Sequence, residues 1–392
     1  MAAPKLRFKE FDNQWDKIKI NDQAQTVTSG SRDWAQYYSE SGDKFIRMTN
    51  LVRDGIYLDL SDLKFVQLPK DSNEGKRTSL KFGDILISIT AELGKLGWIP
   101  EGLGTAYINQ HTALVRMKDS VDSKFIAYSL STEKYNNKLN SLNDSGAKAG
   151  LNLGTIRNFE LIVPPKEEQT KIASFLSAVD EKISQLTQKH ALLSQYKQGM
   201  MQKLFSQQIR FKADDGSEFG EWDYLELNEV LDYEQPTKYI VKSTDYDSSY
   251  LTPVLTAGKT FILGYTNETS GIFEGDKENV IIFDDFTTAY KFVNFRFKVK
   301  SSAMKILKLN HFQNNIFYIY SVFSLLNLPL GDEHKRRWIS EYSKQEIPVP
   351  CLEEQTKISN FLSAIDQKIE VVAQQIEQAK HWKKGLLQQM FV

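Results

Sequence analysis

Two stretches of this chain, 160–205 and 346–391, are copies of one another set 186 positions apart. Roughly 20 of their 46 aligned residues are identical without a gap, which chance does not produce. Identity is densest at 167–172 and 353–358, where both copies read Glu-Glu-Gln-Thr-Lys-Ile. Any fold for this chain must therefore contain one structural element twice.

Each copy is predicted to form one long helix. A Val-Pro pair ends the extended segment before it, and the acidic pair that follows suits a helix N-terminus, where the helix dipole favours negative charge. Apolar residues then recur at alternating spacings of four and three, which is the 3.5-residue repeat of a coiled-coil seam. The first five seam positions of the two copies are Ile172, Leu176, Val179, Ile183 and Leu186, and Ile358, Leu362, Ile365, Ile369 and Val372.

The matched seams predict that the two helices pair with each other. A helix of about 40 residues is about 60 Å long at 1.5 Å per residue, so the contact would be extensive. A single amphipathic helix more often lies on the core of its own domain, and that alternative stays open here. Lys197 and Lys383 occupy the same seam position, where a lysine either fixes the register or extends its ammonium group to solvent.

The rest of the sequence predicts globular domains. A chain of 392 residues exceeds one ordinary core of about 100 to 200 residues, so two globular units are expected. Segments rich in Ile, Val and Phe follow Gly-Asp turns at 83–84 and 275–276, and the alternation at 290–299 also favours a strand. We expect an α/β (α+β) protein divided into a first mixed α/β domain, a helix, a second such domain and a second helix, at 1–158, 159–207, 208–344 and 345–392.

A weaker repeat links the beginnings of the two domains. The segment 6–9, Leu-Arg-Phe-Lys, precedes Trp15, and the similar segment 209–212, Ile-Arg-Phe-Lys, precedes Trp222. Four additional residues separate the two parts of the second copy. The chain is therefore expected to be an internal repeat with pseudo-two-fold character.

The combination of these features is specific to a family. A variable domain, an extended segment ending in Val-Pro, and a long helix opening with Glu-Glu-Gln-Thr-Lys-Ile occur at 161–176 and again at 347–362. This doubled arrangement resembles the specificity subunits of type I restriction-modification enzymes. The Gly-Asp-Ile-Leu-Ile segment at 83–87 and the Asn-Gln-His-Thr turn at 109–112 are also similar to the first recognition domain of that family.

The resemblance implies that each domain is a target recognition domain that reads one half of a bipartite DNA sequence. It also implies that the helices form an antiparallel coiled coil, which sets the length of the unread spacer. Two methyltransferase subunits would dock on the helices, and restriction subunits with motor and nuclease activity would join through them. The chain itself would carry no catalytic residue. A coiled-coil scaffold that joins proteins without touching DNA is the alternative.

Charge distribution suggests which residues would contact DNA. Net charge is −1, but 286–331 contains no Asp or Glu and several Lys and Arg, which predicts a local cationic face. The basic run 334–337 and the segment 146–152 lie at similar distances before the two Val-Pro pairs, so both are interpreted as exposed loops, although a charged run can also be merely solvated.

Arginine is the best reader of guanine edges, whereas lysine mostly contacts phosphates. The amides and imidazole of 109–111 could read bases, or could merely complete a turn. The candidate DNA-contact residues are Arg47, Arg53, Lys76, Arg77, Lys81, Asn109, Gln110, His111, Lys148, Lys291, Arg296, Lys298, His334, Lys335, Arg336 and Arg337.

Several other classes of protein are disfavoured by the sequence. The single cysteine, Cys351, cannot form an internal disulfide, and the longest apolar runs fall far short of the roughly 20 residues that span a bilayer. The first ten residues lack the apolar core of a signal peptide. The five histidines have no metal-ligand spacing. We therefore expect a cytoplasmic protein without a metal site or cofactor.

Overall fold

The computed structural model describes residues 4–70, 73–142, 150–256, 260–311, 313–326 and 337–391. The chain forms two compact units, one of Met1–Thr187 with Gln374–Val392 and the other of Gln188–Ala373. Each unit contains one globular domain together with one part of each long helix. Each domain is thus completed by segments from both copies of the repeat.

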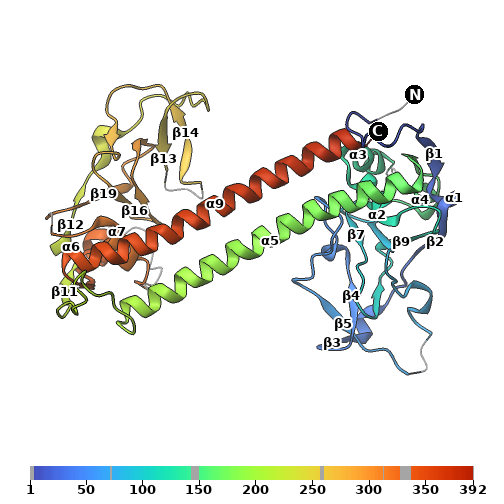
Figure 1. Ribbon diagram of the computed structural model, residues 1–392, viewed down its shortest axis with the longest axis horizontal. Helices are drawn as coiled ribbons and strands as arrows, with labels where there is room; N and C mark the ends of the chain where they lie inside the picture. The colour runs from blue at the N-terminus through green and yellow to red at the C-terminus, as the bar shows by residue number, and fades with distance from the viewer. Residues whose placement is uncertain are drawn as a thin grey trace. The chain divides into compact units, whose positions relative to one another are not determined.

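The repeated segments form two unbroken helices, α5 (Lys166–Phe205) and α9 (Leu352–Met390), drawn in green and red in Figure 1. Eight of the ten predicted seam residues are buried, and the other two, the equivalent Ile183 and Ile369, are half-buried. The seam therefore faces inward, as expected from its spacing. No helix among the described residues is both long enough and apolar enough to cross a membrane.

Each unit pairs parts of the two long helices. In the first unit, Asp180 of α5 forms an ion pair of 2.5 Å with Lys383 of α9, and in the second, Lys197 of α5 forms one of 2.6 Å with Asp366 of α9. Early residues of α5 thus meet late residues of α9, and late residues meet early ones, so the helices are antiparallel. The two ion pairs join equivalent positions of the repeat, so both seam lysines face the opposite helix and suit a role in fixing register.

The first domain is built on two four-stranded sheets. One has the antiparallel order β2-β9-β6-β7, and the other has the order β3-β5-β4-β8, with β4 and β8 parallel. A further pair, β1 with β10, joins the start of the domain to the strand before α5. The elements are β1 (Asp16–Lys19), α1 (Ile20–Gln23), β2 (Ala24–Ser29), β3 (Tyr38–Ser39), β4 (Asp43–Ile46), β5 (Lys64–Val66), β6 (Ile85–Ser88), β7 (Leu96–Trp98), β8 (Ala106–Ile108), β9 (Thr112–Met117), α2 (Ser123–Ser131), α3 (Glu133–Ser141), α4 (Leu153–Arg157) and β10 (Glu160–Val163).

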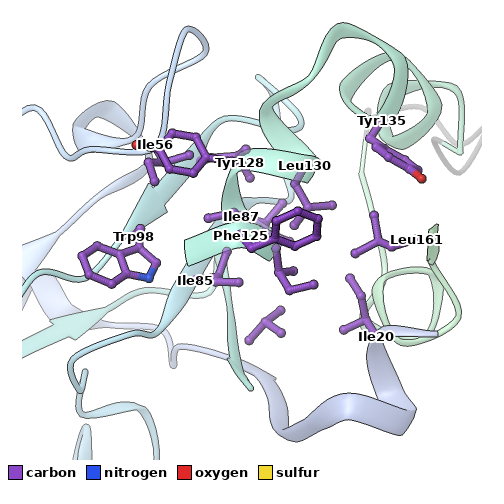
Figure 2. Close-up of a cluster of buried hydrophobic side chains, with 14 of the residues drawn as sticks. Ile20, Ile56, Ile85, Ile87, Trp98, Phe125, Tyr128, Leu130, Tyr135 and Leu161 are labelled. Atoms are coloured by element: carbon purple, nitrogen blue, oxygen red, sulfur yellow. The ribbon is translucent and has the colours of Figure 1, made fainter. Parts of the chain in front are cut away.

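Helix α2 buries its apolar side against the antiparallel sheet. Phe125 of α2 lies with Ile85 and Ile87 of β6 in one cluster of buried side chains (Figure 2). The same cluster includes Ile172 of α5 and Leu386 of α9. The domain and parts of both helices therefore share one core. Each large apolar side chain that is fully buried in it contributes about 1.5–3 kcal/mol to stability.

The second domain repeats most of this topology. Its sheets have the orders β12-β19-β16-β17 and β14-β13-β18-β15, with β13 and β18 parallel, and β11 pairs with β20 before α9. The first of these sheets has the same order as β2-β9-β6-β7. The second matches the first domain in three strands only, β14-β13-β18 for β5-β4-β8, because its fourth strand, β15, lies beside β18, whereas β3 lies beside β5. The elements are β11 (Asp223–Glu226), α6 (Leu227–Val230), β12 (Leu231–Glu234), β13 (Thr252–Leu255), β14 (Ile262–Thr266), β15 (Phe273–Glu274), β16 (Val280–Asp284), β17 (Tyr290–Val293), β18 (Arg296–Val299), β19 (Met304–Leu309), α7 (Ile316–Phe323), α8 (Arg337–Ser340) and β20 (Glu346–Val349).

The alternating stretch at 290–299 forms two strands rather than one. Strand β17 pairs with β16 in one sheet, whereas β18 pairs with β13 and β15 in the other. Asn294 and Phe295 lie between them, where the chain passes from sheet to sheet. A period of two describes side-chain alternation only, so it does not reveal that the partner strands change.

The second glutamate of the repeated motif is buried at the start of each long helix. Glu168 accepts hydrogen bonds of 2.7 Å from two guanidinium nitrogens of Arg7. Glu354 accepts bonds of 3.0 and 2.7 Å from Arg210 and one of 2.9 Å from Trp222 Nε1. The Arg-Phe-Lys repeat therefore supplies the arginine that neutralises the glutamate of the helix repeat.

The glutamine of the motif ties each long helix to its domain. Gln169 donates to the carbonyl five residues earlier at 2.7 Å and accepts from the backbone N–H of Asp122, the N-cap of α2, at 2.9 Å. Gln355 repeats both contacts at 2.8 and 2.9 Å, the second with Asn315, the N-cap of α7. Much of the identity between the repeats is thus used inside the protein.

Candidate nucleic-acid interface

One turn in the first domain holds the end of the predicted exposed loop 146–152, which we call the closing segment of this domain. This turn follows β6, and its Thr90 forms a β-bridge with Gly150, the first described residue after 143–149. The same turn contains Ala91, whose φ of 58° is in the left-handed region. Lys148, one of the candidate contacts, lies outside the described residues.

The equivalent turn of the second domain, after β16, holds the residue that follows the basic run 334–337, which we call the closing segment of the second domain. Asp285 Oδ1 accepts a hydrogen bond of 3.0 Å from the backbone N–H of Trp338, which lies just after the undescribed 327–336. Thr288 in this turn has a φ of 59°, matching that of its counterpart in the first domain. His334, Lys335 and Arg336 belong to the undescribed stretch.

The amide and imidazole side chains at 109–111 surround the turn of the first domain. His111 Nδ1 lies 2.8 Å from Thr90 Oγ1, and its Nε2 lies 3.0 Å from Gln110 Nε2. The Gln110 amide nitrogen donates to Nε2 in the tautomer whose ring proton is on Nδ1, and that proton then lies toward Thr90. Asn109 Oδ1 accepts from the backbone N–H of His111 at 3.1 Å. All three side chains are half-buried, so they complete a turn while keeping polar edges near the surface.

The turn of the second domain is held by a carboxylate. Asp284 accepts hydrogen bonds from the backbone N–H groups of Phe286 and Thr287, at 3.1 and 3.3 Å. Phe286 is nevertheless 61% exposed. A turn fixed by side-chain to backbone bonds therefore presents an aromatic ring to solvent directly after Asp285, the residue that binds the backbone of Trp338.

The candidate cations of the first domain have different surroundings. Arg47 is held by Asp62, through its carboxylate at 2.7 Å and its carbonyl at 2.6 Å. Arg77 donates to Thr28 Oγ1 and to the Ser29 carbonyl, although its side chain is exposed. Three others are also exposed, and no ion pair with a described residue is found for them: Arg53, Lys76 and Lys81.

The acid-free stretch of the second domain is not a continuous cationic face. Lys298 is buried, 2.8 Å from Glu268, and its ammonium group lowers the pKa of Glu268 to about 2. Arg296 pairs with Glu274 at 3.0 Å. Acids from other strands thus neutralise cations that are isolated from acids in the sequence. This placement gives no support to a DNA contact by Lys298.

Two further candidates of the second domain differ in exposure. Lys291 on β17 is exposed, and no ion pair with a described residue is found for it. Arg337, at the start of α8, is only 4% exposed. Its side chain therefore lies within the domain rather than on an open surface, which gives no support to a DNA contact by Arg337.

The anchoring residues themselves were not found by sequence reasoning. Thr90 and Asp285 belong to no motif and have no unusual spacing, and they matter only because the fold brings them to the ends of the closing segments. The common position of the two turns, each directly after a central strand, could be recognised only once the two sheets were seen to share one strand order.

Comparison with known proteins gives a consistent result. The family model described as "Type I restriction modification DNA specificity domain" matches twice, over residues 13–195 and 220–381. The EcoR124I/EcoR124II type I restriction enzyme specificity subunit of Escherichia coli is 54% identical over 133 residues, which are 33% of this chain and 33% of that protein. The type I restriction enzyme MjaVIII specificity subunit of Methanocaldococcus jannaschii is 27% identical over 270 residues, 59% of this chain and 60% of that protein.

Among solved structures, the S subunit of a type I restriction-modification system from M. genitalium is similar over 100% of this chain and 99% of that one. The TM-score is 0.69 at 15% sequence identity, so this likeness concerns the fold. The matches to the two sequence relatives span about a third and about 60% of their lengths.

Proposed function

The chain belongs to the type I restriction-modification DNA specificity family, and we propose that it is the DNA-recognition subunit of such a system, each domain reading one half of a bipartite target. The observation that carries this proposal is the doubled architecture. Two antiparallel sheets with the same strand order, one in each domain, hold a closing segment at the equivalent turn, while the sequences differ around those turns. Equivalent frames with different side chains suit two different half-sites.

In this proposal the chain selects DNA and its partners perform the chemistry. The turns at 90–91 and 285–288 and the segments that they anchor are the surfaces that would meet base edges. Exposed cations such as Lys76, Lys81 and Lys291 would contact phosphates. The serial division at 1–158, 159–207, 208–344 and 345–392 remains our assignment of two recognition domains and two spacers. A DNA ligand also implies the cytoplasmic location expected from the sequence.

We further propose two methyltransferase subunits per chain, with restriction subunits joining through them. The repeated Glu-Gln pair is buried, so it cannot be the docking surface. A different repeated feature suits that role: Tyr196 on α5 and Trp382 on α9 are equivalent positions, and their side chains are 51% and 53% exposed. Exposed aromatics at equivalent positions would give two copies of one partner the same anchor. Native mass measurement of the assembled methylase should find two methyltransferase subunits, and a stable one-to-one complex would contradict the proposal.

The experiment that tests the main proposal is methylome sequencing of a host that carries this chain with its cognate methyltransferase subunit. We expect one bipartite motif whose two half-sites are separated by a fixed spacer. Exchanging 208–344 for the same part of a relative should change one half-site and leave the other intact. A coiled-coil scaffold without DNA binding predicts no methylated motif that depends on this chain.

A further inference from the structure

A cleft of about 1070 Å³, lined by apolar surface and by charged side chains, opens in the first unit. It is lined by the loop 53–55, by residues at the end of α2 and in α3, and by the last turns of α9. Five of its residues are cationic and three are acidic, so two positive charges remain after subtraction. The cations are Arg53, Lys134, Lys380, Lys383 and Lys384, and the acids are Asp54, Glu133 and Asp180.

Some of these charges are already satisfied within the protein. Lys383 pairs with Asp180 across the two helices, and Lys380 lies 2.9 Å from Glu377 on its own helix. For Arg53, Lys134 and Lys384, no ion pair of 4.0 Å or less with a described residue is found, although Arg53 donates long hydrogen bonds to Asn136 Oδ1 at 3.5 Å and to the Leu93 carbonyl at 3.4 Å. The cleft therefore contains cationic groups that remain available to an anion.

The internal repeat separates the cations that helix pairing needs from those that it does not. Lys383 has an equivalent, Lys197, and both make the same interhelical ion pair. Lys380 and Lys384 correspond instead to Ser194 and Gln198 of α5, which are uncharged. The interhelical ion pair is thus made in both units, whereas the charges of Lys380 and Lys384 occur in one copy only, so the pair does not depend on them.

The polar groups around the cations are of the types that bind phosphate oxygens. The amides of Asn137, Asn140 and Gln388 line the cleft, and so does Thr132, the N-cap of the nine-residue helix α3. Amides, hydroxyls and helix N-termini, together with Lys and Arg, are the usual phosphate contacts in protein–DNA complexes.

We propose that this cleft binds backbone phosphates of the DNA next to the first half-site, as a contact that is independent of sequence and uses Lys380 and Lys384, whose equivalents on α5 are uncharged. This inference rests on the proposed function. A duplex read by the first domain continues past its half-site with one charge per about 1.7 Å, so its phosphates are already concentrated at this unit. An acidic protein segment would have to be brought there separately, which is why we favour DNA as the occupant.

The test removes the unrepeated charges by copying the other repeat. In the assembled methylase, Lys380→Ser with Lys384→Gln places the residues of α5 at the equivalent positions of α9, so helix pairing is retained. Each phosphate contact contributes a slope of about −0.9 to log Kobs against log[salt]. We expect the slope to become shallower by about one if only Lys384 contacts a phosphate and by about two if Lys380 exchanges Glu377 for one, with affinity at about 0.1 M salt falling about eightfold per contact on both cognate and unrelated DNA. The methylated motif should stay the same.

The matched control is Lys182→Ser with Lys368→Gln. These lysines are equivalent, exposed and on the same two helices, but they do not line the cleft. A salt slope that is no shallower in the cleft variant than in this control would overturn the inference. Loss of methyltransferase subunits from the cleft variant with an unchanged slope would also overturn it, by making the cleft a protein contact. If the unaltered complex binds no specific DNA, the proposed function itself fails, and that result is recognised before any variant is compared.

Discussion

Removing the charge of Arg210 should destabilise the second unit because it leaves Glu354 buried without its cation. The Glu354 side chain is 1% exposed and accepts three hydrogen bonds, two of them from Arg210. Arg210→Met keeps an unbranched side chain near Trp222 but removes both donors. Breaking a buried ion pair from one side costs about 3–5 kcal/mol. Because the Arg210 side chain is 22% exposed, water can reach the vacated position, so we expect about 3 kcal/mol.

A double-mutant cycle separates this ionic effect from lost packing. Glu354→Gln should cost less, about 1–2 kcal/mol, because the partly exposed guanidinium group can be hydrated and the amide oxygen can still accept from Trp222. Arg210→Met combined with Glu354→Gln should be more stable than Arg210→Met alone, since no buried charge then remains unpaired.

The assay is equilibrium urea unfolding of the full chain, followed by circular dichroism and by tryptophan fluorescence. Arg7→Met provides the matched variant in the first unit, because Arg7 forms the same bidentate pair with Glu168. Strictly additive costs in the double mutant, or an unfolding midpoint of Arg210→Met equal to that of the unaltered chain, would refute the reasoning.

Three further outcomes are expected. Inserting four residues between Leu186 and Leu193 lengthens α5 by about 6 Å, so methylome sequencing should find a spacer longer by one or two base pairs with both half-sites unchanged; an unchanged spacer would mean that the helices do not set it. His111→Ala should relax only the first half-site, and an altered second half-site would contradict this. Lys298 lowers the pKa of Glu268 from 4.5 to about 2, so the stability that this ion pair contributes is present above pH 4.5 and is lost as the pH falls toward 2. Glu268→Gln should therefore make the free energy of unfolding less dependent on pH in that window. An unchanged pH dependence would count against the pair.

Repetition and periodicity in the sequence predicted the long helices correctly. A helix seam depends on residues three and four apart, so Ile172, Leu176 and their equivalents could be identified without knowing what covers them. Burial of eight of the ten predicted seam residues agrees with that reasoning. The family could also be inferred from the sequence, because its signature is a local motif that occurs twice.

The likeness of the two domains was hidden from sequence reasoning. The segments around Arg7 and Arg210 and the Gly-Asp turns at 83–84 and 275–276 suggested it only weakly, yet one four-stranded sheet has the same strand order in both domains and the other shares three strands. A sheet requires a suitable apolar pattern on each strand and not particular residues, so two sequences can differ at most positions and still form one topology. Strand partners far apart in the chain are determined by this tertiary packing.

Charge shows most clearly what only the tertiary structure decided. The sequence around Lys298 contains no acid, yet the fold brings Glu268 to 2.8 Å from its ammonium group. The Glu168 carboxylate, in a motif that reads as a charged helix start, is buried against Arg7. Periodicity depends on neighbours in the chain, whereas electrostatic interaction falls with distance in space and depends on burial. The helices were therefore determined by local sequence, and which charges remain free to meet a ligand was determined by the fold.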